Sequence, residues 1–474
     1  MQTPPAPTAH QQRLIIFIIA LAAFMGALDT SIVNISLPSI AAYFHEDIGD
    51  VSWVVMGYGL VIACLLLVFG KLGDTHGFKK VYIGGFAVFT IGSLLCGLSM
   101  TLGHLIGFRL LQGLGAAALE AVGPAMIALY LPQTVRGRAL GTLATAVSVA
   151  IAIGPVLGGL LTEFISWHWI FFVNIPVGVM AIALGRKLLP ETEPCGTGGS
   201  FDIPGTAFIV AALFFLIYPL NMGLKMGWTS PFILGSFLLS VIFWAAFVRR
   251  ECSCEEPLLN LALFRNSAFS AGTIAGALVM LAFAGATFIF PFYLEGVKGL
   301  STAVAGIVLT VPAVTLMIFG PLAGKISDRR GTRGLTTGAA ALTAAVFLLY
   351  ASLTMESSLF VIVLGLALLG VTSGLYFPPN MNQVLGQSPK GEEGVASSVM
   401  QTAKNIGDVL GVAVFGTVFI QAIVSAFAHN PETPHTEIAA ATLIPGFHAA
   451  FLAGAVVCAI AAALSLMARD RQRV

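Results

Sequence analysis

The chain has 474 residues, of which 57% are hydrophobic and only 9% are charged. Soluble domains carry roughly a quarter charged residues, so this composition excludes an ordinary water-soluble globule and suits a chain immersed in lipid. The net charge of +1 gives no reason to expect a nucleic-acid partner.

Long apolar runs follow one another along almost the whole chain. A helix that crosses the hydrocarbon core needs about 20 apolar residues, and about fourteen runs approach that length. The sequence therefore predicts an all-α membrane protein, and the first run, which has no small-residue cleavage site before Pro38, is predicted to be retained. The predicted spans are 14–37, 51–70, 81–100, 104–131, 138–162, 168–188, 204–222, 231–248, 268–294, 302–324, 335–353, 358–386, 395–427 and 446–468.

Lysine and arginine are distributed unevenly between the segments that join these spans. If both termini lie in the cytosol, the outside loops hold only Lys225 and Lys298. Arg109 and Lys404 fall inside apolar runs, and the other basic residues all fall in inside segments. Because basic residues concentrate in cytoplasmic loops, we predict a multi-pass protein of the cell (inner or cytoplasmic) membrane with both termini cytosolic.

A short loop motif occurs twice. The segment from Gly70 to Lys79 reads GKLGDTHGFK, and the segment from Gly324 to Arg333 reads GKISDRRGTR. Two related halves are the usual plan of secondary transporters. We therefore predict an N-terminal six-helix bundle (1–188), a linker with two extra transmembrane helices (189–267) and a C-terminal six-helix bundle (268–474).

Five ionisable residues fall well inside apolar runs: Asp29, Arg109, Glu120, Lys404 and Asp408. An ionised group at the bilayer centre costs about 2.5–3.5 kcal/mol or more, so each is a candidate functional residue. A carboxylate at such a depth can load and release a proton as water access alternates between the two sides.

Arg109 and Glu120 lie eleven residues apart on one predicted helix, which is about three turns and about 16 Å along the axis. We therefore expect both side chains to face the same way, as two stations along one central cavity. Glu120 is a candidate for substrate choice; the alternative is a glutamate paired to a neighbouring helix for packing.

Asp29 lies about halfway through the first helix, near the depth at which transporters of this plan bind substrate. Its alternative role is a permanently neutral, hydrogen-bonded carboxyl group near Asn34. Lys404 and Asp408 have i, i+4 spacing and share a helix face, so they form either a structural ion pair or a proton switch.

A series of motifs, taken in chain order, resembles the major facilitator superfamily and specifically its fourteen-helix drug:proton antiporter branch. The resemblance covers nearly the whole chain. It rests on LDTSIVNISLP from Leu28, the loop motif from Gly70 to Lys80, RLLQGLG from Arg109, GPVLGG from Gly154, WHWIFFVNIP from Trp167 and FDIPG from Phe201.

The resemblance implies a proton-coupled antiporter that exports amphipathic, cationic organic compounds by alternating access. It implies that Arg109 faces the bundle interior and takes part in proton coupling, together with Asp29, Glu120, Lys404 and Asp408. Polar residues expected to bind substrate are Asp29, Asn34, Tyr58, Gln112, Glu120, Asn380, Asn382 and Asn405. A cytosolic gate is expected from Asp74, Lys79, Arg138, Asp328 and Arg329, with solvated loop charges as the alternative. Close helix packing is expected from Gly154, Pro155, Gly158 and Gly159.

Other functions are disfavoured. The chain has no G-x-x-x-x-G-K-[ST] motif for ATP and no nucleophile–base set or metal cluster, so we predict neither an enzyme nor a cofactor or metal site. The expected partners are a small-molecule substrate, protons and the lipid bilayer, with the protein working as a monomer. The alternative on the same fold is export of a lipid, a siderophore or an anionic metabolite. A non-transporting membrane sensor is disfavoured, because it would need an appended soluble domain.

Overall fold

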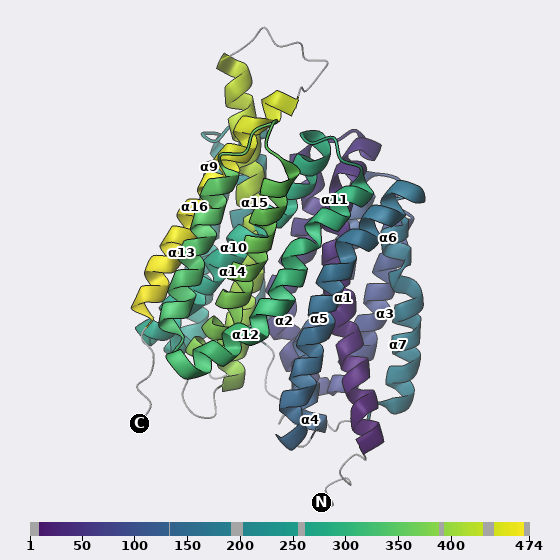
Figure 1. The fold of residues 1–474 in the computed structure, drawn as a ribbon. Helices are drawn as coiled ribbons and strands as arrows, with labels where there is room; N and C mark the ends of the chain where they lie inside the picture. The colour runs from purple at the N-terminus through teal and green to yellow at the C-terminus, as the bar shows by residue number, and fades with distance from the viewer. Residues whose placement is uncertain are drawn as a thin grey trace, which may run out of the picture.

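The computed structural model describes residues 9–131, 133–190, 202–254, 261–387, 393–429 and 440–468. Over these residues the chain is almost entirely α-helical, as predicted (Figure 1). Fourteen helical segments are long and apolar enough to cross a membrane, and each overlaps one predicted span. The all-α, fourteen-span prediction is therefore confirmed.

We name three groups of helices by their order in the chain: N-terminal, middle and C-terminal. The predicted domain boundaries remain a prediction. The N-terminal helices are α1 (Ala9–Phe44), α2 (Ile48–His76), α3 (Phe78–Gly97), α4 (Leu102–Tyr130), α5 (Gln133–Phe164), α6 (Trp169–Phe172) and α7 (Asn174–Leu188). The middle helices are α8 (Ile203–Met226) and α9 (Pro231–Ser253). The C-terminal helices are η1 (Leu261–Arg265), α10 (Ser267–Gly296), α11 (Thr302–Leu309), α12 (Val311–Arg330), α13 (Arg333–Tyr350), α14 (Leu359–Leu385), α15 (Glu393–His429) and α16 (Ala440–Met467).

Two of the predicted spans are each built from two helices. The span at 168–188 is divided between α6 and α7, and the span at 302–324 is divided between α11 and α12. The second break falls at Thr310, two residues before Pro312. Proline has no backbone N–H, so Pro312 cannot donate to the carbonyl of Val308 one turn earlier, which explains a break at this position.

The α1 helix begins and α16 ends at the same end of the bundle, which we call the terminal end (Figure 1). The opposite end is called the distal end. The repeated loop motif lies at the terminal end, where it ends α2 and α12. Gly77 and Gly331 occupy equivalent places in the two copies, with φ of 93° and 86°. Only glycine adopts this conformation at little cost, so the repeat encodes the same helix stop twice.

The four motif residues of α5 bring helices together near the distal end. A Cβ atom on Gly154 would lie 2.6 Å from the Ser31 side chain of α1, and one on Gly159 would lie 2.5 Å from the Thr302 oxygen of α11. Gly158 packs against Ile35 of α1, and the Pro155 carbonyl contacts Gly306 of α11. Small residues thus allow α5 to touch both α1 and a C-terminal helix at backbone distance.

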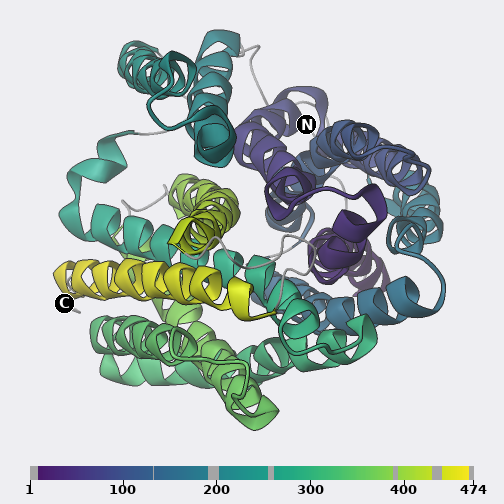
Figure 2. The ribbon, with the colours of Figure 1, turned by 90° about the horizontal axis from the view of Figure 1, so that it is seen from above.

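The α8 and α9 helices lie side by side at the edge of the molecule when it is seen from above (Figure 2). Near its distal end, α8 forms hydrogen bonds with one N-terminal helix and one C-terminal helix. Asn221 accepts a hydrogen bond from Trp53 of α2 at 3.0 Å, and Thr417 of α15 donates one to the Leu220 carbonyl at 2.6 Å. The middle helices are therefore tied to α2 and α15 together.

Lys225, at the distal end of α8, adds an ion pair to this attachment. Its Nζ lies 2.5 Å from Asp50 and 2.9 Å from Asp47, near the start of α2. Partial burial alone would lower the pKa of Lys225, but the hydrogen bonds to the two carboxylates outweigh it and raise that pKa above its ordinary value. The lysine therefore stays charged at this attachment.

Candidate transport site

Arg109 of α4 lies fully buried among the N-terminal helices. Its Nη1 donates to Asp29 Oδ2 of α1 at 2.5 Å, and its Nε donates to the Val54 carbonyl of α2 at 3.0 Å. The guanidinium also covers the Tyr58 ring, with Cζ 3.9 Å from the ring centroid. The two opposite charges neutralise each other, which makes their burial tolerable within a membrane span.

Three uncharged side chains complete the surroundings of this ion pair. Gln112 accepts from Arg109 Nη1 and donates to Asp29 Oδ1, both at 2.8 Å. Asn174 of α7 donates to the same carboxylate oxygen at 2.9 Å. Ser93 Oγ of α3 accepts from Gln112 at 3.1 Å and from Asn174 at 3.0 Å. We call Asp29, Ser93, Arg109, Gln112 and Asn174 the buried network; it joins α1, α3, α4 and α7.

A second polar group lies between the N-terminal and C-terminal helices. Glu120 of α4 is exposed, and its Oε2 accepts a hydrogen bond from Asn405 Nδ2 of α15 at 3.4 Å. Lys404 and Asp408, beside Asn405 on α15, are half-buried and interact electrostatically with Glu120. The Lys404 Nζ also lies 5.3 Å from the Phe377 ring centroid. We call Glu120, Lys404, Asn405 and Asp408 the α4–α15 cluster.

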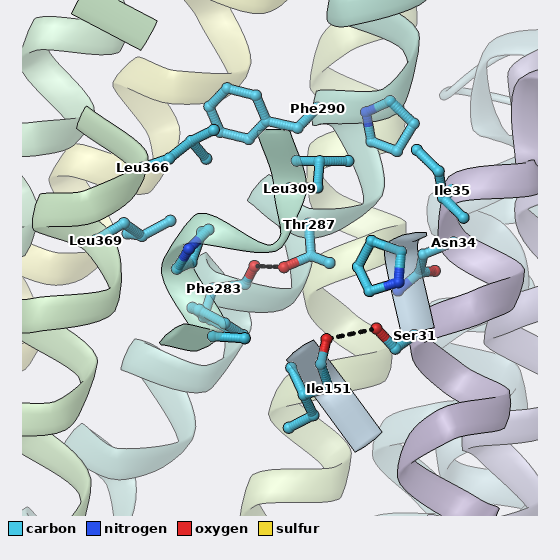
Figure 3. A pocket seen from close by; sticks show the side chains of 14 residues that line it. Ser31, Asn34, Ile35, Ile151, Phe283, Thr287, Phe290, Leu309, Leu366 and Leu369 are labelled. Carbon is cyan, nitrogen blue, oxygen red and sulfur yellow. Dashed lines mark hydrogen bonds between the residues drawn. The ribbon is translucent and has the colours of Figure 1, made fainter. Parts of the chain in front are cut away.

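An apolar cavity of about 60 Å³ lies between the same two groups of helices, nearer the distal contact of α5 and α11 (Figure 3). Phe283 and Phe290 of α10 lie on its wall. Among its few polar groups, Ser31 and Thr287 donate their hydrogen bonds to backbone carbonyls, as the dashed lines in Figure 3 show. Asn34 Oδ1 is buried without a hydrogen-bond partner among the described residues.

The α1 helix separates the buried network from this cavity. Asp29 points from α1 toward α4 and α7, where all its partners lie. Ser31 and Asn34 line the cavity instead (Figure 3). They lie about half a turn and more than one turn beyond Asp29 along α1. One helix therefore presents a charged face to its own bundle and a weakly polar face to the space between the helix groups.

The predicted substrate-binding residues fall into two environments. In this structure the half-buried and exposed ones are accessible to a ligand, and the buried ones are not. Asp29, Tyr58, Gln112 and Asn380 are buried, whereas Asn34, Glu120, Asn382 and Asn405 are half-buried or exposed.

The expectation that Arg109 and Glu120 occupy one cavity is corrected by this arrangement. Both lie on α4, but Arg109 is buried against Asp29 whereas Glu120 is exposed beside α15. Helical spacing fixes the rotation of two side chains about one axis. It cannot show that neighbouring helices cover one position and leave the other open.

The predicted cytosolic gate is only partly described. The side chains of Asp74, Asp328 and Arg329 lie outside the described residues. Lys79 is half-buried and Arg138 is exposed, both toward the terminal end. The gate therefore stays a prediction.

Sequence reasoning missed two members of the buried network. Asn174 lies in the WHWIFFVNIP segment, so that motif offered a signal for it. Ser93 had none, because a serine in an apolar helix most often bonds to its own backbone. Here its hydroxyl instead donates to the Phe171 carbonyl at 3.0 Å while accepting from the network.

Comparison with known proteins agrees with this fold. A sequence profile of the Major Facilitator Superfamily matches residues 19–412. The chain is 33% identical over 413 residues to the riboflavin transporter RibZ of Clostridioides difficile, with 87% of this chain and 89% of the relative covered. It is 31% identical over 490 residues to the tetracenomycin C resistance and export protein of Streptomyces glaucescens, covering 96% and 91%.

A solved structure shares the fold at low sequence identity. It is a bacterial homologue of the human lysosomal transporter Spinster, in an inward-facing and unoccupied conformation, with a TM-score of 0.71, 17% identity and 98% of each chain covered. The chain described here belongs to the Major Facilitator Superfamily. It is a multi-pass membrane transporter of small molecules and not an enzyme.

Proposed function

We propose that this protein is a proton-coupled antiporter that exports amphipathic organic cations by alternating access. The observation that carries the proposal is the position of Glu120. Its carboxylate is exposed between the N-terminal and C-terminal helices and bonds across to Asn405. A carboxylate that reaches solvent and touches both moving parts has the access and the contacts that exchange of a proton for a cation requires.

The apolar cavity supports the amphipathic part of the proposal. Its wall of aromatic and aliphatic side chains suits the hydrocarbon part of a ligand, while the α4–α15 cluster suits a charged end. Among the relatives, the Streptomyces protein is named for resistance to and export of an antibiotic, which favours the outward direction.

The buried network has a different proposed role. Because Asp29 and Arg109 satisfy each other, we assign them to holding α1, α3, α4 and α7 in register as one rigid unit. Any contribution of theirs to coupling would act through the position of α4, which carries both Arg109 and Glu120.

The proposed membrane orientation has the terminal end in the cytosol, in keeping with the distribution of basic residues. The backbone contact of α5 with α11 then lies on the outer side, and the exposed Glu120 faces inward access. The predicted division into two six-helix bundles provides the two parts that rock against each other.

The test is proton movement in proteoliposomes. An inward proton gradient is imposed, lumenal pH is reported by a trapped dye, and ethidium is added to the wild type and to Glu120→Gln. We expect ethidium to trigger proton flux in the wild type and at least about tenfold less in the variant, a difference of about 1.4 kcal/mol. Glu356→Gln, which removes an exposed carboxylate in the loop before α14, is the matched control and should behave as wild type.

Wild-type vesicles that show no cation-triggered flux, with correctly folded protein, would overturn cation export. A second cargo then has support of its own, because the C. difficile relative carries the name of a riboflavin transporter and the cavity wall includes two aromatic rings, Phe283 and Phe290. The same vesicles tested for riboflavin uptake and release would decide between an uncharged aromatic cargo and an organic cation.

A further inference from the structure

The α4–α15 cluster contains a positive charge where a cation exporter would be expected to show only negative ones. Lys404 lies near two carboxylates: Asp408 is one helical turn further along the same face of α15, and Glu120 of α4 bonds the neighbouring Asn405. Its ammonium interacts electrostatically with both. Lys404 therefore already places a positive charge near Glu120, the carboxylate that a transported cation would need.

We propose that Lys404 is a built-in competitor for the transported cation at Glu120. In the empty transporter its ammonium stands in for the substrate beside Glu120 and over the Phe377 ring. When an organic cation enters, Lys404 turns back to Asp408, and both Glu120 and the aromatic face become available to the ligand. This role deepens the proposed function and rests on it.

The side-chain chemistry allows this exchange. Lysine is a compact charge on a flexible four-carbon stem, so it can move between two carboxylates without moving the backbone. The face of Phe377 attracts any cation that lies over it, and a flat organic cation would cover it better than an ammonium group. Asn405, which bonds Glu120 and is itself bonded by Gln401 at 3.1 Å, keeps the glutamate in place while its cationic partner changes.

Under this proposal, the formal charges of the cluster predict the exchange ratio. Glu120 and Asp408 with Lys404 sum to one negative charge, whereas Asp29 and Arg109 cancel each other in the buried network. One proton or one monovalent cation therefore brings the cluster to zero, and an unbalanced charge at this depth is costly. The cluster holds one or the other, which gives one-for-one exchange.

The experiment measures ethidium binding by fluorescence to purified protein in detergent, for wild type, Lys404→Met and Lys404→Arg. Methionine keeps the length of the stem and removes the competing charge. We expect Lys404→Met to bind ethidium at least about fivefold more tightly than wild type and Lys404→Arg to bind like wild type. The gain must depend on the carboxylate, so Lys404→Met should give no gain in a Glu120→Gln background.

Three outcomes of the ethidium measurement would overturn the competitor role of Lys404. An unchanged or weaker affinity in Lys404→Met, with wild type binding ethidium, overturns the competitor role and leaves cation export intact. Weaker ethidium binding by Lys404→Met would mean that Lys404 contacts the ligand directly. A gain that persists with Glu120→Gln also overturns the proposal, because the lysine would then act elsewhere. Wild-type protein that binds no ethidium overturns this inference and cation export together.

Discussion

The buried network and the α4–α15 cluster both place charges inside membrane spans. They reduce the free-energy cost of those charges in different ways. In the buried network Asp29 has three donors within 2.9 Å, and Arg109 has an acceptor in each of α1, α2 and α4. In the cluster Glu120 is exposed, and among the described residues its hydrogen bond is the one of 3.4 Å from Asn405. Charges that are fully paired hold helices together, whereas charges that are loosely paired and accessible stay free to change partner.

The largest difference between the two regions should appear in stability. Asp29→Asn leaves the Arg109 guanidinium buried beside a neutral group, and breaking a buried ion pair in this way costs about 3–5 kcal/mol. We expect a large fall in the melting temperature of the purified protein, followed by tryptophan fluorescence. Part of the loss should return in Asp29→Asn combined with Arg109→Gln. A melting temperature equal to that of wild type would contradict the structural role of the pair.

Ser93 tests whether the uncharged part of the buried network also contributes. Ser93→Ala removes the acceptor shared by Gln112 and Asn174 and the donor to the Phe171 carbonyl. Gln112 and Asn174 keep their bonds to Asp29, but each is left with one unpaired buried N–H, which should destabilise the protein by about 1–3 kcal/mol. Ethidium affinity measured on the folded protein should be unchanged. Thr90→Ala, which removes a hydroxyl that donates to the Phe86 carbonyl one turn earlier in α3, is the control.

Glu120→Gln should give the opposite pattern. Glutamine keeps the size of the side chain and can still bond Asn405, so we expect the free energy of unfolding to change by no more than about 0.5 kcal/mol. Cation-triggered proton flux should nevertheless fall at least about tenfold, since the charge is gone. A variant that melts far below wild type would show that Glu120 belongs with the structural charges after all.

Thiol labelling measures accessibility in the two regions directly. Cys96 lies against Gln112 in the buried part of α3, with Sγ 3.7 Å from Oε1. In protein that keeps Cys96 as its only native cysteine, we expect a polar maleimide to modify Glu120→Cys at least about tenfold faster than Cys96. Equal rates would contradict the difference in exposure on which the comparison rests.

The positions of the membrane spans were predictable because a spanning helix must satisfy its own backbone and needs a long apolar run to do so. The two helix breaks, between α6 and α7 and at Thr310, were not anticipated, although Pro312 offered a local signal for the second. The four motif residues of α5 and the repeated glycines at Gly77 and Gly331 were also visible in the sequence, since small residues and helix stops are local properties.

The partners of the charged residues were decided only by tertiary packing. Gly92 of α3 is so close to α4 that a Cβ atom there would lie 2.7 Å from the Gln112 Cα, and this contact is what sets Ser93 beside Gln112. Asp29 and Arg109 are eighty residues apart and meet because α1 and α4 cross at that depth.

The sequence by itself thus determined which residues enter the membrane and which of them carry charge. Only the tertiary structure decided that Asp29 and Arg109 neutralise each other in a closed network while Glu120 and Lys404 face the space between helix groups. The reason is physical: hydrophobicity and helical period are properties of one segment, whereas burial and pairing depend on how several helices rotate against one another.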